Sequence, residues 1–195
     1  FGDTQILFTD VITSESRIMY YRNILERAKR IAPFLLFDQD PYLTVMDGRL
    51  VWVMDAYTIT DRYPYSQPTL LSTKAGKIRF NYIRNSVKVL VDAYDGNVEF
   101  YISDPEDPLI LSWNKIFPDL FKPLEEMPPE LILHRRYPMD LFQVQAQIFA
   151  VYHMTDPNTF YNREDVWSFP THGGSQASPY YIVTKLREEE RAEYV

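Results

Sequence analysis

NYIRNSVKVLVDAYDGNVEFYISDPEDP, residues 81–108, is the stretch that decides the fold class. An Asp-Gly pair between two apolar runs is a strong signal for a β-hairpin, and Asp95-Gly96 stands in that position here. The charged segment Asn81–Asn85 enters the hairpin, and the acidic loop Asp104–Pro108 leaves it. The stretch therefore predicts an α+β fold with an antiparallel sheet.

A second hairpin is predicted closer to the N-terminus. The apolar runs Tyr42–Met46 and Leu50–Tyr57 flank a second Asp-Gly pair, Asp47-Gly48. One more strand is expected at Tyr180–Leu186. The long connection between the hairpins, residues 58–77, is rich in Ser, Thr and Pro and is expected to be functional or mobile.

Two main helices are expected to cover this sheet. One starts at Thr13 or Ser14, carries apolar residues at helical spacing and ends before Pro33, so that it spans roughly residues 15–32. The other runs over residues 138–154 with a wide apolar stripe. We interpret residues 1–195 as one soluble domain, with its sheet built from the two hairpins and the later strand, cut from a larger protein.

Composition excludes several classes of function. The net charge is −7 without a basic stripe, which argues against nucleic acid as a partner. The absence of Cys excludes disulfides, thiolate nucleophiles and Cys-ligated metal sites. The 15 Tyr, 12 Phe and 3 Trp suit either a binding surface or, more simply, aromatic residues in strands.

A metal site is the first chemical hypothesis, because carboxylates are dense at Asp38-Gln39-Asp40 and at Asp104–Asp107. Calcium takes six or more oxygen ligands, often from alternating acidic positions on a turn, so Asp38 and Asp40 are the candidate ligands. Neither run has the Gly and Glu of an EF-hand loop, and Asp-Pro pairs also start ordinary turns. No nucleophile elbow or phosphate-binding glycine loop is found in the sequence.

A binding cleft is the second hypothesis, because polar and aromatic residues crowd the strand ends of the two hairpins. Such a cleft would take a peptide, a sugar or a lipid head group. The simpler alternative is that Arg84 forms a structural ion pair between acidic strand ends. The candidate residues are Asp55, Tyr57, Asn81, Arg84 and Asp92.

Several segments together resemble the soluble region of uncharacterised protein family 0182, in colinear order over almost the whole chain. The segments are Ser16–Ile24, Ala32–Leu35, Asp38–Tyr42, Asp55–Thr58, Asn81–Lys88, Ile116–Pro118, Arg136–Pro138, Tyr152–Met154 and Phe160–Asp165. The resemblance implies a large bacterial integral membrane protein, with N-terminal spans and a long soluble portion on the outer side of the inner membrane. It supplies no established activity and no catalytic residues.

These observations predict a binding or assembly module in the extracytoplasmic part of a multi-spanning membrane protein. Its expected partners are the rest of its own chain and components of the cell envelope. The alternative is a metal-assisted hydrolase acting on cell-envelope polymers, with Asp38, Asp40, Asp55 and Asp92 as its carboxylates.

Overall fold

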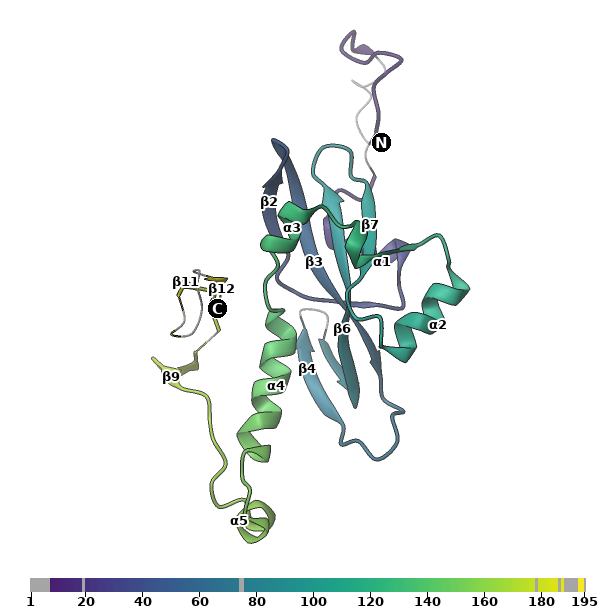
Figure 1. Cartoon of the computed structure of the whole chain (residues 1–195). Helices are drawn as coiled ribbons and strands as arrows, with labels where there is room; N and C mark the ends of the chain where they lie inside the picture. The colour runs from purple at the N-terminus through teal and green to yellow at the C-terminus, as the bar shows by residue number, and fades with distance from the viewer. Residues whose placement is uncertain are drawn as a thin grey trace.

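A six-stranded sheet forms the centre of the protein in a computed structural model, which describes residues 8–18, 20–73, 76–177, 179–185, 187 and 193–194 (Figure 1). The strand order is β1-β3-β6-β7-β8, and β2 also pairs with β3. All pairings in this sheet are antiparallel except that of β7 with β8. The bounds of its strands are β1 Leu36–Phe37, β2 Tyr42–Met46, β3 Arg49–Thr60, β6 Tyr82–Asp92, β7 Val98–Ile102 and β8 Phe121–Pro123. The predicted α+β class and both hairpins are confirmed.

The two Asp-Gly pairs behave differently. Asp47 and Gly48 have φ angles of 48° and 73°, so they form the tight turn that a two-residue hairpin requires. Between β6 and β7 the connection is longer, and there only Gly96 has a positive φ, at 68°. A side chain on Gly96 would collide with the guanidinium of Arg27, whose Nη1 donates to the Gly96 carbonyl at 2.9 Å. Glycine at this position thus adopts the positive φ of the turn and leaves room for the Arg27 guanidinium.

Helices and a small hairpin cover both faces of the sheet. One face packs against α1 (Ile24–Ile31) and α2 (Pro108–Ile116). The opposite face packs against the 3₁₀ helix Leu124–Glu126, α3 (Pro129–Leu133) and α4 (Met139–Tyr152). The hairpin of β4 (Thr69–Thr73) and β5 (Gly76–Phe80) joins α4 in a separate apolar cluster through Leu71, Phe80 and Val144.

Two helix predictions have different outcomes. The helix predicted over residues 138–154 is α4, with bounds within two residues of the prediction. The helix predicted from residue 15 is too long, because α1 begins only after Asn23. Asn23 caps that helix by accepting a hydrogen bond from the Glu26 N–H at 3.1 Å, and Tyr21 just before it has a φ of 52°. The interpretation of residues 58–77 as one long connection is also wrong, since they contain the end of β3, all of β4 and the start of β5.

The C-terminal part departs most from expectation. The strand expected at Tyr180–Leu186 is reduced to β11 (Val183–Thr184), which pairs with β12 (Glu193–Tyr194) outside the central sheet; Leu186 lies outside the described residues. Before it come the helix α5 (Pro157–Asn162) and a short hairpin of β9 (Thr171–His172) and β10 (Ser175–Gln176). Among the described residues, no helix is both long enough and apolar enough to cross a bilayer.

Candidate functional site

A buried ion pair lies at the middle of the sheet. Asp55 on β3 and Lys88 on β6 are directly opposite each other in the antiparallel ladder, and the Lys88 ammonium donates to an Asp55 carboxylate oxygen. Their side chains are only 6% and 5% exposed. Removing both charges from water costs free energy, and their mutual attraction offsets that cost. Loss of either partner would leave the other as an uncompensated buried charge.

A second carboxylate, Asp38, lies beside this pair on the loop between β1 and β2. It accepts hydrogen bonds from the Tyr57 hydroxyl, from the Asp140 N–H at 3.0 Å and from the Asp40 N–H at 2.8 Å. Asp140, in the first turn of α4, in turn accepts from the Gln39 N–H and side-chain amide, both at 3.1 Å. The loop and the start of α4 thus hold each other in place through reciprocal hydrogen bonds.

Burial determines the protonation behaviour of this network. Burial, reinforced by the charge of Asp38, raises the pKa of Asp140 from 3.8 to about 6. Burial also raises the pKa of Asp55, although Lys88 and Asn85 oppose the rise. The pKa of the Tyr57 hydroxyl is raised by burial and by Asp38, so it stays protonated and acts as a donor.

The raised pKa of Asp140 makes stability depend on pH. Between pH 4 and 6 the folded protein binds a proton that the unfolded chain has released, so this contribution to stability is lost as the pH rises. We expect Asp140→Asn to reduce the decline in the free energy of unfolding over that window by roughly 1 kcal/mol, allowing for solvent screening, and so to flatten the decline in melting temperature. The measurement is thermal unfolding at several pH values, with the exposed Asp119→Asn as the control. An unchanged slope in Asp140→Asn would contradict the assignment.

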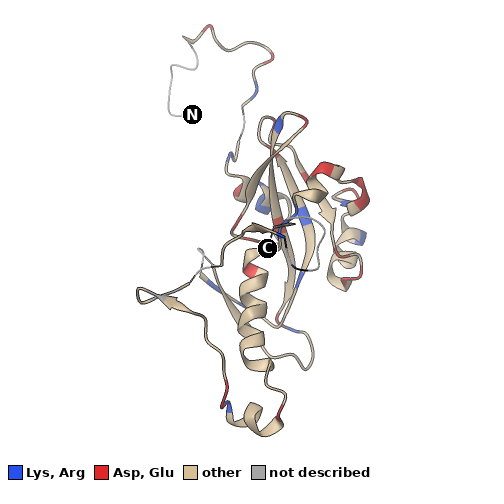
Figure 2. Ribbon diagram, turned by 60° about the vertical axis from the view of Figure 1, so that its left-hand side comes forward, with Lys and Arg blue, Asp and Glu red and all other residues tan. Residues whose placement is uncertain are grey.

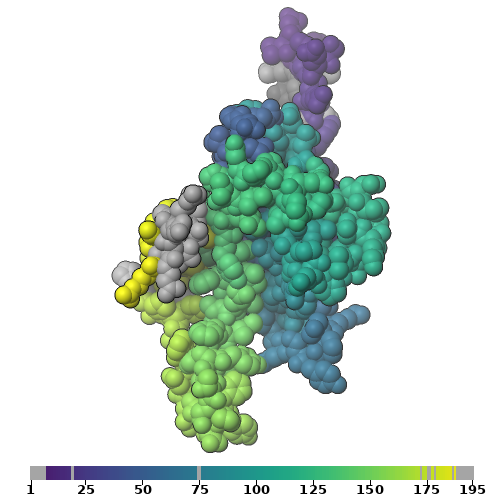
Figure 3. Space-filling view, in the orientation of Figure 1, coloured from purple at the N-terminus to yellow at the C-terminus, as the bar shows by residue number. Residues whose placement is uncertain are grey.

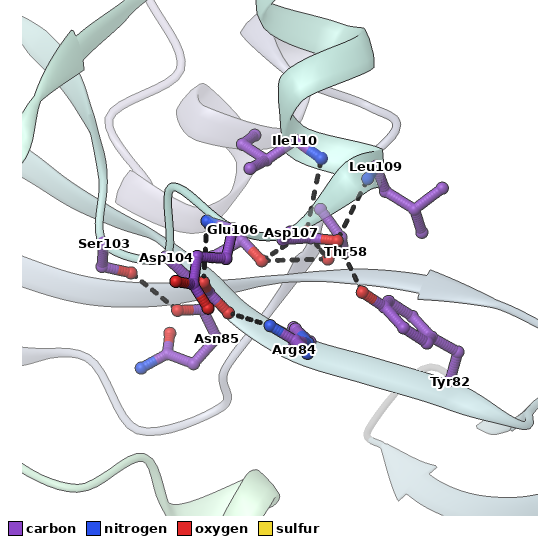
Figure 4. A network of polar contacts seen from close by, with 11 residues as sticks. Thr58, Tyr82, Arg84, Asn85, Ser103, Asp104, Glu106, Asp107, Leu109 and Ile110 are labelled. Atoms are coloured by element: carbon purple, nitrogen blue, oxygen red, sulfur yellow. Dashed lines mark hydrogen bonds and ion pairs between the residues drawn. The ribbon is translucent and has the colours of Figure 1, made fainter.

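A third polar cluster, around Asp107, lies where β3 and β6 meet α2 (Figure 4). The Asp107 carboxylate accepts hydrogen bonds from Thr58 and Ser86, both at 2.5 Å, and from Tyr82 at 2.6 Å. It also accepts from the first N–H groups of α2 and so caps that helix. Every oxygen of Asp107 is engaged with the fold, so this cluster is structural.

The residues predicted for a binding cleft do not come together as one group. Asp55 and Tyr57 belong to the buried network. Asp92 instead pairs with Arg49 at the far end of β6, four residues and about 13 Å along the strand from Lys88. Asn81 pins the loop after β3 by exchanging hydrogen bonds with the Tyr63 backbone at 2.7 and 3.0 Å. Arg84 makes the structural ion pair considered for it, with Asp104 at 2.9 Å.

The predicted metal ligands Asp38 and Asp40 are adjacent to this network. Asp38 is buried, and Asp40 lies at the rim of a cavity of about 360 Å³ that Gln39 and Asp140 also line. Within the described ranges, no group of three or more His, Asp or Glu side chains is arranged to hold a metal ion. Calcium at Asp38 and Asp40 stays a prediction.

Sequence reasoning missed Lys88 and Asp140. A signal for Lys88 was present, because it is the single charged residue in the apolar run 87–91, as Asp55 is in the run 51–56. Two opposite charges, each alone in an apolar strand, point to a buried cross-strand pair. Asp140 carries no such signal, since an acidic residue in the first turn of a helix is ordinary.

An exposed apolar surface runs along α4 and the segment that follows it. We call it the apolar face and define it by Phe142, Ile148, Phe149, Tyr152, Tyr161 and Trp167. Phe149 is 58% exposed, Tyr161 87% and Trp167 52%. Asp140 is the single charged residue of α4, and it is buried, so the remainder of the helix is uncharged (Figure 2).

A cleft of about 620 Å³ opens beside the apolar face. The loop between β3 and β4, residues 66–69, forms one wall, and α4 with α5 forms the other. The Tyr152 hydroxyl bridges the two walls by donating to the Gln67 side chain at 3.0 Å. Figure 3 shows this side of the molecule, with α4 and α5 in green beside the blue loop and hairpin.

Comparison with known proteins places the chain in a family without an assigned activity. The sequence model of "Uncharacterised protein family (UPF0182)" matches residues 1–195. Proteins named "UPF0182 protein" from Pelobacter propionicus, Pelotomaculum thermopropionicum and Methanospirillum hungatei are 54%, 51% and 48% identical over the whole of this chain. The chain covers only 21%, 21% and 22% of their respective lengths. No solved structure matches. This chain belongs to the uncharacterised protein family UPF0182.

Proposed function

We propose that this region is an assembly module of a larger membrane protein, and that it binds other segments of its own polypeptide through the apolar face. The observation that carries the proposal is α4, which packs Val144 against the β4–β5 hairpin and also exposes large apolar side chains, interspersed with Gln145 and Gln147, on its solvent side. A helix with large apolar side chains on both its packed side and its exposed side is typically covered further in the complete protein. A group of exposed large apolar side chains of this kind typically marks an interaction site.

The occupant we propose is the remainder of the same chain. The matched relatives are about five times as long as this region, so a large amount of polypeptide is tethered to it. A tethered partner is present at a high effective concentration, which favours docking without strong individual contacts. The uncharged, aromatic character of the face suits another protein segment better than a charged partner.

The location on the extracytoplasmic side of the cell membrane is part of the same proposal. It rests on the resemblance to proteins with N-terminal spans and a long outer portion. Components of the cell envelope would then be available as further partners. The hydrolase alternative gains no support from a particular observation, because Asp38 and Asp55 are buried in hydrogen bonds and Asp92 lies elsewhere.

A cysteine-labelling experiment on the full-length protein tests both parts of the proposal. Because this region has no Cys, single cysteines can be introduced by Phe149→Cys on the apolar face and Lys115→Cys on the exposed side of α2 as the control. We expect a membrane-impermeant maleimide to label the Lys115→Cys variant on intact cells. The Phe149→Cys variant should react only after denaturant is added, because the docked segments cover it.

The two outcomes that would overturn the proposal are separate. Labelling of the Lys115→Cys variant only after lysis would overturn the extracytoplasmic location. Labelling of the Phe149→Cys variant as fast as the control would overturn docking at the apolar face. The full-length protein without either substitution reports any reaction of cysteines outside this region.

A further inference from the structure

A small cavity with a cationic lining lies on the sheet face opposite α1 and α2, under the chain that joins α3 to α4. Its volume is about 280 Å³. Lys88 and Asn85 of β6 contribute to its lining, and Arg135 and Arg136 of the α3–α4 connection face them. Within the described part of the chain, no Asp or Glu lines it. Three cationic side chains around one cavity are notable in a chain with a net charge of −7.

The two arginines are held by the fold in different ways. The guanidinium of Arg136 lies 4.3 Å from the centre of the Tyr42 ring and 5.2 Å from that of Tyr181, so aromatic contacts orient it. Arg135 donates through Nε to the Ile132 carbonyl at 3.2 Å. Its two terminal nitrogens have no partner among the described residues. A guanidinium group fixed by Nε with its outer nitrogens available is suited to bind an oxyanion.

A buried polar atom at the same cavity also lacks a partner. Asn85 Oδ1 is inaccessible to solvent and accepts no hydrogen bond from any described residue. The Asn85 amide lowers the pKa of Asp55, which places its NH₂ group toward that carboxylate and its oxygen away from it. Figure 4 shows the Asn85 side chain directed away from the Asp104–Asp107 network. An unpaired buried acceptor is costly, so Asn85 is a polar side chain that the fold leaves incompletely satisfied beside the cavity.

We propose that this cavity binds a phosphate group, either on a free solute or on a lipid head group. In this site Arg135 and Arg136 hold the phosphate oxygens. Lys88 stays paired with Asp55, so we do not assign it to the phosphate. The site is independent of the apolar face, and binding here goes beyond the assembly role.

The test is calorimetric titration of the full-length protein with glycerol 3-phosphate and, separately, with short-chain phosphatidylglycerol. Arg135→Gln removes the donors while leaving the Arg136–Tyr42 contact intact. We expect it to weaken binding roughly tenfold or more, because a charge-assisted hydrogen-bond pair is lost. Arg62→Gln, an exposed arginine on the loop after β3, is the matched control and should bind normally. The affinity of Arg135→Lys should fall between those of Arg135→Gln and Arg62→Gln, because lysine keeps the charge but cannot form the bidentate contact of a guanidinium.

Binding of glycerol 3-phosphate that depends on Arg135 assigns the site to a phosphorylated solute. Binding of the lipid alone, with the same dependence on Arg135, assigns it to a head group. No binding of either compound at millimolar concentration overturns the proposal, as does binding that Arg135→Gln leaves unchanged. The melting temperature of each variant shows whether a loss of binding reflects unfolding.

Discussion

Replacing Lys88 with methionine is expected to destabilise the protein by about 3–5 kcal/mol. The substitution keeps most of the side-chain volume but leaves the Asp55 carboxylate unpaired at a site where it is only 6% exposed. A buried carboxylate without a cation must take up a proton or remain charged in an apolar environment, and both are unfavourable at neutral pH. The measurement is the free energy of unfolding from urea denaturation of the wild type and the variant.

Two controls separate loss of the pair from loss of packing. The double variant Asp55→Val, Lys88→Met removes both charges and should recover much of the lost stability, because apolar replacement of a buried pair is often neutral. Arg49→Met breaks the exposed ion pair with Asp92 and should change stability little. The destabilisation by Lys88→Met should also shrink as the pH falls, because Asp55 of the variant is then protonated in the folded protein and in the unfolded chain alike. Equal losses in the single and double variants would contradict a stabilising role for the pairing.

Replacing Asp107 with alanine is expected to have a comparable effect, roughly 3–5 kcal/mol. The substitution removes the carboxylate acceptor of Thr58 and Ser86, leaving these buried hydroxyls only each other at 3.1 Å, and it removes the cap of α2. Because α2 contributes Ile110 to the main apolar cluster, loss of its cap also loosens the packing on that face. Chemical denaturation measures the change.

The contribution of Asp107 to stability depends on pH with the opposite sign to that of Asp140. Burial alone would raise the pKa of Asp107, but hydrogen bonds from Ser86, Thr58 and Tyr82 outweigh it and lower the pKa. The stabilisation is therefore complete above about pH 4 and is lost as the pH falls through the lowered pKa. Asp156→Ala removes a similar cap from α5 at an exposed site and should cost less. If both variants lost the same stability, the buried hydrogen bonds of Asp107 would contribute nothing beyond capping.

The central elements could be predicted because their signals are local. The turn at Asp47-Gly48 and the apolar stripe of α4 follow from residue type and spacing alone. The strands β1 and β8 have only two and three residues, too few for any periodicity. They exist because β3 and β7 offer edges to pair with, which is a property of the assembled sheet.

Two residues of the buried network, Asp55 and Tyr57, were named from the sequence for a binding cleft, which stays a prediction. Asp55 and Tyr57 were expected in one cluster, and the structure keeps them together on the same face of β3. Asp38 was considered separately, as a metal ligand, although it is the hydrogen-bond partner of Tyr57. The two meet because β1 pairs with β3 at Leu36 and Tyr57, and the sequence carries no sign of that pairing. The ion pair of Arg84, in contrast, could be predicted, because Asp104 follows the same hairpin in the sequence.

The measurement that tests the assembly role most directly is a structure of the full-length protein in a lipid nanodisc, determined by single-particle electron microscopy. We expect Phe149, Tyr152 and Trp167 to be covered by segments from outside this region, while the exposed side of α2 remains in solvent. If these three side chains instead face solvent in the complete protein, the apolar face is not a docking surface within the polypeptide and the proposed function is wrong.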